Sequence, residues 1–284
     1  MLVHLPKTVA EAREHVAEGA VPVGGATLVW ATWQRDGFPG QAVSLREVPQ
    51  ANAMGPEELG GAVVLSRIGE EVPYVLRAAA AGVGTGAVRR AATVGGNIAG
   101  STLRCLLPAA LVLEARATVL APHGVYETDL AEVTAKRPVL LGLRWSTPVA
   151  SAYRKLPAAA GGAPPLVVAT ALHAGTDPDV GPGTGPRTDA GHGTGPRTDA
   201  GHGTSPRTDA GTGHRLRVAV RDGYDVLTAT ANLGPGTAHP ADQLRETPLA
   251  DLPGAWGLID EQVATLLAAA SAEGRTGDEP RRSD

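Results

Sequence analysis

Apolar and polar positions over the first 150 residues alternate between short extended runs and helical spacing. Thr8 and Glu11 stand at the spacing of a capping box and predict a helix that ends at Gly19. Apolar runs predict strands at Leu2–Leu5, Val21–Val23, Ala42–Leu45, Gly61–Leu65, Thr118–Ala121 and Val139–Leu143, and helical spacing predicts helices at Leu28–Trp33, Pro73–Ala81 and Pro108–Ala115. This mixture favours an α/β or α+β domain over residues 1–150.

A different pattern begins at Ser151. Extended apolar runs predict strands at Leu166–Leu172, Leu216–Val220 and Val226–Ala231, and amphipathic spacing predicts a terminal helix at Asp260–Ala272. We therefore expect a small C-terminal α+β domain over residues 151–274.

A repeated segment interrupts this second domain at residues 176–214. Its unit, Gly183–His192, recurs at once as Gly193–His202 and contains no large apolar residue. Such a segment buries too little surface to offset the entropy lost on ordering, so the sequence predicts a disordered insertion. Its histidines are typical of solvated side chains rather than metal ligands. The tail at residues 275–284 is likewise expected to be disordered.

Composition excludes several classes of function. The net charge of −4 and the pI of about 6.1 lack the basic footprint of a nucleic-acid-binding protein. No apolar run approaches the roughly 20 residues that span a bilayer, and Met1–Lys7 lacks the pattern of a secretory signal. Cys105 is the only cysteine, so the chain cannot hold an iron–sulfur cluster by itself. A cytoplasmic location is expected.

Two glycine pairs are the candidate site of chemistry. They lie in Gly24–Thr27 and Thr93–Asn97, each after an extended run. A glycine pair after a strand lets backbone N–H groups surround a phosphate, and the Thr27, Thr93 and Asn97 side chains can add donors. Neither pair fits a Rossmann or Walker motif. With 37 glycines in the chain, each pair alone is better read as a turn.

The two loops in this order resemble the FAD-binding subunits of molybdopterin dehydrogenases, which include carbon monoxide dehydrogenase medium subunits and the flavin domain of xanthine dehydrogenases. The resemblance is carried by Val21–Leu28 and by Val88–Ala99, with further counterparts at His4–Pro6, Leu106–Pro108 and Tyr153–Lys155. It spans nearly the whole chain except the repeat and the tail.

The resemblance implies an α+β fold with a two-subdomain FAD-binding domain of the PCMH type, divided at about residue 50, before the C-terminal domain. It implies FAD as the cofactor, with no catalytic side chain and no metal site in this chain. Tyr153 and Lys155 either lie near the isoalloxazine or form a surface pair on a strand. The implied FAD-binding residues are Val23, Gly24, Gly25, Ala26, Thr27, Leu28, Thr93, Val94, Gly95, Gly96, Asn97, Ser101, Thr102, Arg104, Tyr153 and Lys155.

One stretch departs from the family pattern. After Asn97 the family continues with a Ser-Pro pair and then an aspartate that bonds the sugar chain of the flavin. Here the stretch is a residue shorter, Thr102 replaces the proline, and Arg104 or Cys105 stands where the carboxylate belongs. Losing that acceptor removes about 0.5–1.5 kcal/mol, unless Arg104 contacts a flavin phosphate instead. Cys105 is read as a small buried residue in preference to a redox thiol.

The resemblance also implies a division of labour. A molybdenum-cofactor subunit oxidises the substrate, an iron–sulfur subunit passes the electrons, and this chain transfers them through FAD to an external acceptor. The main alternative is a subunit that keeps the fold without FAD and acts as a structural or interaction module, which the altered stretch favours. A flavin reductase of the enolpyruvoyl-glucosamine reductase type ranks last, because its catalytic acid and substrate domain are missing.

Overall fold

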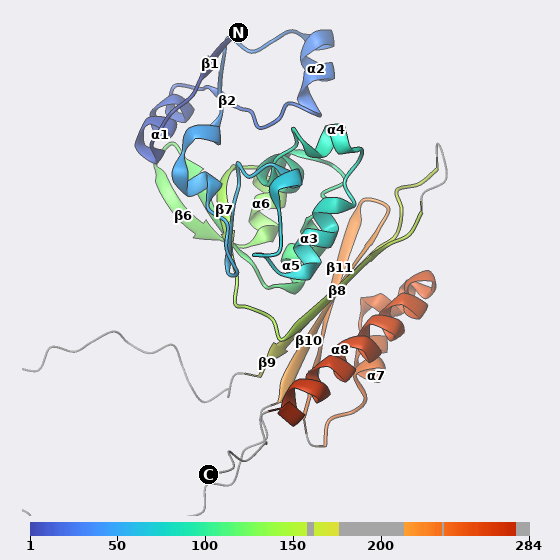
Figure 1. The fold of residues 1–284 in the computed structure, drawn as a ribbon. Coiled ribbons are helices and arrows are strands. Elements are labelled where there is room, and N and C mark those ends of the chain that lie inside the picture. Colours follow the sequence, from blue (N-terminus) through green and yellow to red (C-terminus); the bar gives the residue numbers. More distant parts are fainter. Residues whose placement is uncertain (158–161, 176–212, 235, 277–284) are drawn as a thin grey trace, which may run out of the picture.

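The computed structural model of the chain describes residues 1–157, 162–175, 213–234 and 236–276, so the expectations for the repeat fall almost wholly outside the described residues, as do those for most of the tail. Three sheets carry the described part, and Figure 1 shows them one above another in chain order. Helices accompany every sheet, which confirms a mixed helix and sheet fold. The division into two subdomains stays a prediction.

The first sheet is small and parallel. Its strand order is β1-β3-β2, with β1 at Leu2–His4, β2 at Val21–Pro22 and β3 at Gln41–Val43, and its helices are α1 at Val9–Ala17 and α2 at Val29–Asp36. The predicted cap is confirmed, because Thr8 Oγ1 accepts a hydrogen bond from the Glu11 N–H at 3.1 Å. The Glu11 carboxylate in turn accepts from the Lys7 N–H at 2.7 Å. The cap fixes where α1 begins beside β1.

The second sheet is antiparallel. Its order is β4-β7-β5-β6, with β4 at Glu58–Gly60, β5 at Arg116–Ala121, β6 at Gly124–Thr128 and β7 at Val139–Arg144. The strand predicted at Gly61–Leu65 is wrong. The strand ends at Gly60, and the Gly61 and Val63 carbonyls then accept from Gly95 and Val94 at 2.8 and 3.0 Å. These residues therefore support the second glycine loop instead of extending a ladder.

Four helices pack around the second sheet: α3 at Tyr74–Ala81, α4 at Gly86–Arg89, α5 at Leu107–Val112 and α6 at Leu130–Lys136. The face of α3 that helical spacing predicts is confirmed, since all four of its members are buried: Val75, Leu76, Ala79 and Ala80. They join the largest apolar cluster of the described chain together with α5 and the inner side of β5.

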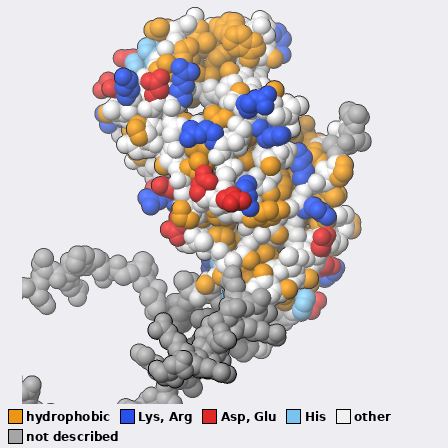
Figure 2. Space-filling view, in the orientation of Figure 1, with side chains coloured by type: hydrophobic (Ala, Val, Ile, Leu, Met, Phe, Trp, Pro, Cys, Tyr) orange, Lys and Arg blue, Asp and Glu red, His pale blue; other side chains and the backbone are white. Residues whose placement is uncertain are grey.

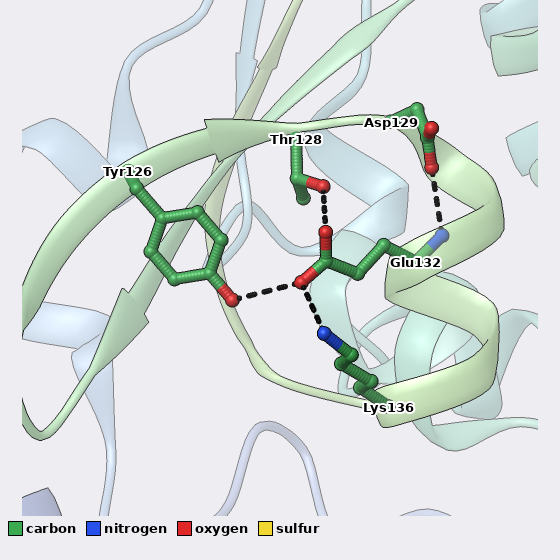
Figure 3. Close-up of polar contacts among 5 residues, drawn as sticks. All are labelled: Tyr126, Thr128, Asp129, Glu132 and Lys136. Atoms are coloured by element: carbon green, nitrogen blue, oxygen red, sulfur yellow. Dashed lines mark hydrogen bonds and ion pairs between the residues drawn. The ribbon is translucent and has the colours of Figure 1, made fainter.

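A carboxylate joins β6 to α6 (Figure 3). Asp129 caps the helix by accepting from the Glu132 N–H at 2.7 Å, and Glu132 accepts from Thr128 Oγ1, Tyr126 Oη and Lys136 Nζ. The bond from Thr128 is the largest cause that holds the pKa of the Glu132 carboxyl below its usual range. Neither β6 nor α6 is among the predicted elements.

The third sheet is antiparallel, in the order β11-β10-β9-β8. Its strands are β8 at Ala150–Lys155, β9 at Val167–Ala174, β10 at His214–Asp222 and β11 at Asp225–Leu233, followed by α7 at Pro240–Arg245 and α8 at Trp256–Thr276. The three predicted strands are confirmed as β9, β10 and β11, although β9 begins at Val167, one residue after the predicted start. The predicted terminal helix lies inside α8, which extends beyond it at both ends.

The third sheet has two buried faces, which explains its near-continuous apolar runs. One face packs on α8: it contains Val168, Leu172, Leu216, Val218 and Val220. The other faces α3 and α5, where Ala169, Ala171 and Ala219 join the core of the second sheet. Within the described residues, no helix combines the length and the apolar character that crossing a bilayer requires.

Polar side chains of this inner face reach the backbone of the elements opposite. Ser151 Oγ accepts from the Val75 N–H at 3.2 Å, and Lys155 Nζ donates to the Gly82 carbonyl at the end of α3 at 2.7 Å. His173 Nε2 lies 2.8 Å from the Val112 carbonyl at the end of α5. The small side chains of Ala169, Ala171 and Ala219 let α3 and α5 lie close to the third sheet. The hydrogen bonds from Lys155 and His173 and to Ser151 then join this sheet to the backbone of the two helices.

The residues that flank the repeat segment, Gly175 and Gly213, are hydrogen-bonded to each other. Ala174 pairs with His214 in the ladder, and the Gly175 N–H donates to the Gly213 carbonyl at 2.6 Å. We predict that replacing residues 176–212 by Asn-Gly, a favoured two-residue hairpin turn, leaves the melting temperature equal or higher. A shorter connection loses less closure entropy, by roughly 0.6 kcal/mol per halving of length. Calorimetry checks this, and a fall of more than about 5 °C would contradict it.

Candidate functional site

The first glycine loop follows the edge of the first sheet. The Val23 N–H bonds to the Val43 carbonyl of β3 at 2.9 Å, after which the chain leaves the sheet at Gly24. Ala26 adopts a positive φ of 54°, which is uncommon for a residue with a side chain. The Trp30 N–H then bonds to the Ala26 carbonyl at 3.0 Å, and α2 begins. The loop is thus a sharp turn between strand and helix.

The structure brings the two glycine loops together. A Cβ atom at Gly24 would overlap Thr93 Oγ1, and one at Gly96 would lie 3.1 Å from the same oxygen. The two glycines therefore flank the hydroxyl of Thr93. A Cβ atom at Gly25 would overlap the Ala91 carbonyl and lie 2.9 Å from the Ala92 nitrogen. Backbone packs directly on backbone at this point, which only glycine permits.

The second glycine loop is held by its own hydrogen bonds. Thr93 Oγ1 accepts from the Gly96 N–H at 3.2 Å, and the Thr93 carbonyl accepts from the Asn97 N–H at 2.9 Å. Gly95 and Val94 donate to the segment after β4, as described above. A π-helix then runs over Gly96–Gly100. The backbone N–H groups of Val94, Gly95, Gly96 and Asn97 are therefore occupied inside the protein, and the expectation that both loops hold the flavin stays a prediction.

The first loop has backbone N–H groups without an acceptor among the described residues. Within the described chain, no hydrogen bond engages the backbone N–H groups of residues 24–28, and Gly24, Thr27 and Leu28 are exposed. Successive unpaired N–H groups beside a positive-φ residue and just before a helix form an arrangement that binds anions. Because Gly24 and Gly96 have no side chain, nothing covers the Thr93 hydroxyl from these two positions. These features fit a diphosphate at the first loop, with the second loop as its support.

Asn97 and Ser101 shape the stretch that follows the second loop. Asn97 is buried, and its Oδ1 accepts from the Leu106 N–H at 2.9 Å. Ser101 is also buried, and its Oγ accepts from the Leu103 N–H at 3.2 Å. Thr102, which follows Ser101, is exposed. The two polar side chains hold the turn into α5, and Thr102 is the one open to a ligand.

Arg104 points toward α6. Its Nη2 donates to the Thr134 carbonyl at 2.8 Å, in the last turn of a helix, where carbonyls lack partners along the helix. Its backbone has a positive φ of 41°. A contact from Arg104 to a flavin phosphate would require this bond to break. Cys105 is buried, in agreement with its expected role.

Tyr153 and Lys155 lie on the inner face of the third sheet and not on the open surface. Lys155 caps α3 as described, and no hydrogen bond or ion pair between described residues links either side chain to a glycine pair. The Tyr153 hydroxyl is buried without a partner. Burial, followed by the nearby Cys105, raises the pKa of Tyr153, while Arg221 opposes the rise. Tyr153 is therefore a neutral phenol at every physiological pH.

Other supports of the site are absent from the predicted set. Ala91 contributes only backbone, and Gly61 and Val63 contribute carbonyls, so no side-chain pattern could reveal them. Arg221 lies under the Ser101–Cys105 stretch. In β10 the even-numbered Leu216, Val218 and Val220 face α8, so strand alternation, which places Arg221 on the opposite face, was the available signal for its direction.

Apolar side chains cover the surface next to the first loop. Figure 2 shows them gathered at the end of the molecule where Figure 1 places α2. Trp30 and Phe38 meet edge to face with ring centroids 5.3 Å apart, and both are exposed, as is Leu28. Among the described residues, no group of three or more His, Cys, Asp or Glu side chains could hold a metal.

The contact between Gly25 and Ala91 gives a direct test of how the loops depend on each other. We predict that Gly25→Ala lowers the free energy of unfolding by about 1–3 kcal/mol, as overpacking does, because the new methyl must push the loops apart. Gly40→Ala is the matched control, since a Cβ atom there meets nothing within 4 Å. Urea unfolding measures both. Equal stability of the two variants would show that the loops do not pack as described.

Similar proteins share this fold. Carbon monoxide dehydrogenase from Hydrogenophaga pseudoflava, which lacks the Mo-pyranopterin moiety of its cofactor, is 16% identical over 95% of this chain and 98% of its own, with a TM-score of 0.60. CO dehydrogenase from Oligotropha carboxidovorans is 21% identical over 61% and 69%, with a TM-score of 0.53. Quinoline 2-oxidoreductase from Pseudomonas putida 86 is 18% identical over 61% and 68%, with a TM-score of 0.50.

No curated protein sequence matches the chain. At these identities the solved structures show a common fold only, so the family has to be assigned from the sequence. The sequence model described as FAD binding domain in molybdopterin dehydrogenase matches residues 1–140, which include both glycine loops and the stretch after them. This match confirms the predicted cofactor, FAD. Through residues 1–140 the chain belongs to the family of FAD-binding domains in molybdopterin dehydrogenases.

Proposed function

We propose that this chain is the FAD-binding electron-transfer subunit of a molybdenum-containing hydroxylase or dehydrogenase complex. The observation that carries the proposal is the meeting of the two glycine loops at Thr93, beside the unpaired N–H groups of residues 24–28, within a domain of an FAD-binding family. The solved structures of similar fold come from carbon monoxide dehydrogenase and quinoline oxidoreductase.

The first loop would hold the diphosphate. Its free N–H groups from Gly24 to Leu28 supply donors, and the turn into α2 adds the positive end of a short helix. Thr93 keeps the second loop in place against it and Thr102 offers an exposed hydroxyl to the sugar chain. FAD, when bound, supplies the exchange between one-electron and two-electron chemistry. The residues of this chain bind it, orient it and limit its contact with water.

The proposed partners are a molybdenum-cofactor subunit and an iron–sulfur subunit. Cys105, the only cysteine of the chain, is buried, so an iron–sulfur centre must come from another chain. The described residues likewise contain no cluster of metal ligands. Electrons therefore enter this chain from a partner and leave it for an external acceptor.

The alternative function is a module that keeps the fold without FAD. The Ser101–Cys105 stretch favours this alternative, because it contains no carboxylate and its Arg104 side chain bonds to α6. Purified protein distinguishes the two, because bound flavin absorbs visible light. A colourless protein that stays colourless with added FAD would refute the proposal and support the module.

A prediction for Thr93 tests the site itself. Thr93→Val keeps the shape of the side chain and removes the oxygen that accepts from Gly96. Losing one such bond, about 0.5–1.5 kcal/mol, should weaken FAD binding about two- to tenfold. Thr93→Ser keeps the oxygen and should bind as the parent does. Fluorescence titration measures both, and equal affinity of the Val and Ser variants would remove Thr93 from the site.

The subunit assignment gives a second prediction. The isolated chain should catalyse no oxidation of purines, aldehydes or carbon monoxide, because the proposed function assigns that step to the molybdenum-cofactor subunit. Expression together with the neighbouring genes, followed by purification through this chain, should recover a molybdenum subunit and an iron–sulfur subunit. Recovery of this chain alone, with dehydrogenase turnover, would overturn the assignment.

A further inference from the structure

Arg221 is the most deeply buried charged side chain of the described chain, with 1% of its surface exposed. It lies near the end of β10, on the face of the third sheet that meets the second sheet's core. Its Nη1 donates to the Leu103 carbonyl at 2.7 Å and lies 3.4 Å from Cys105 Sγ. Its Nη2 donates to the Pro165 carbonyl at 2.9 Å. One guanidinium thus joins three segments of the chain.

No carboxylate within the described residues pairs with Arg221, and its Nε has no partner. Two other arginines of the same face, Arg215 and Arg217, both pair with Glu114. Burying a cation without a counter-ion is costly, and carbonyl dipoles compensate it only in part. Unlike Arg215 and Arg217, Arg221 is therefore held by backbone carbonyls and not by an ion pair.

The place that Arg221 contacts is the stretch where the chain departs from its family. Leu103 and Cys105 follow the second glycine loop, and Ser101 and Arg104 of the same stretch are anchored to Leu103 and to α6. Arg221 is the anchor that comes from the third sheet. Without it, the Leu103 carbonyl would lose its donor at the base of the turn that presents Thr102.

We infer that Arg221 is a positioning residue for the flavin site. From β10 of the third sheet it holds the Ser101–Cys105 stretch in place, and this stretch lacks the carboxylate of the family pattern. The inference rests on the proposed function for its link to FAD. Its structural half, that Arg221 holds the stretch closed, stands without the cofactor and can be tested without it.

Cys105 is a built-in reporter for this test. It is the only cysteine in the chain and is 6% exposed, so its rate of reaction with a thiol reagent such as DTNB measures how often the stretch opens. The full-length variants are Arg221→Met, which removes every donor, and Arg221→Lys, which keeps the charge and one nitrogen. Arg217→Met is the control on the same strand and face.

Hydrogen bonds from a charged group contribute about 1.5–3 kcal/mol, so Arg221→Met should raise the rate of Cys105 labelling at least about tenfold. The dissociation constant for FAD should rise by a similar factor, measured well below the melting temperature. Arg221→Lys should fall between Arg221→Met and the parent. Arg217→Met should stay within about twofold of the parent in both measurements, since it leaves the stretch untouched.

Parental labelling and parental FAD affinity in Arg221→Met would overturn the inference, as would equal changes in Arg217→Met. If Arg221→Met does not fold, Arg221→Lys decides. Its single nitrogen cannot replace both Nη1 and Nη2, so its Cys105 should react several-fold faster than that of Arg217→Lys, and equal rates would overturn the inference. If the parent binds no FAD, the proposed function fails, and the labelling rates still decide whether Arg221 holds the stretch.

Discussion

The contact between Gly25 and the backbone of Ala91 is the constraint on which the candidate site depends. The first loop and the residues just before the second loop touch there without a side chain between them. The contact places Gly24 over the Thr93 hydroxyl, and the N–H groups of residues 24–28 have no acceptor among the described residues. A free loop would satisfy those donors with water or with itself. Held against the second loop, it keeps them available to an anion.

The two loops have different roles. The second loop is a rigid support, because Val94 and Gly95 are tied to the segment after β4 and Gly96 is tied to Thr93. The first loop is the donor. The Ser101–Cys105 stretch continues the support toward the third sheet, where Arg221 anchors it. The proposed FAD site thus draws on all three sheets, although the family match ends at residue 140.

The predicted strand at Gly61–Leu65 is wrong because long-range backbone bonds leave no trace in a local pattern. Gly61–Leu65 is apolar enough for a buried strand, yet its carbonyls are drawn to Val94 and Gly95. The stretch from β6 to α6 has little periodicity, yet the carboxylate of Glu132 holds it together. Arg104 donates to the Thr134 carbonyl in the last turn of α6, and its contact with the flavin stays a prediction.

The sequence by itself determined the elements with a strong period, the cofactor and the two loops. Helical spacing marks the buried face of α3, a capping box marks α1, and the glycine pairs with their flanking residues identify the family, because each is a property of neighbouring residues. Only the tertiary structure decided which loop has free donors and which side chains hold them in place. Ala91, Gly61 and Arg221 act through contacts across 30 residues or more, and folding brings together what no local spacing relates.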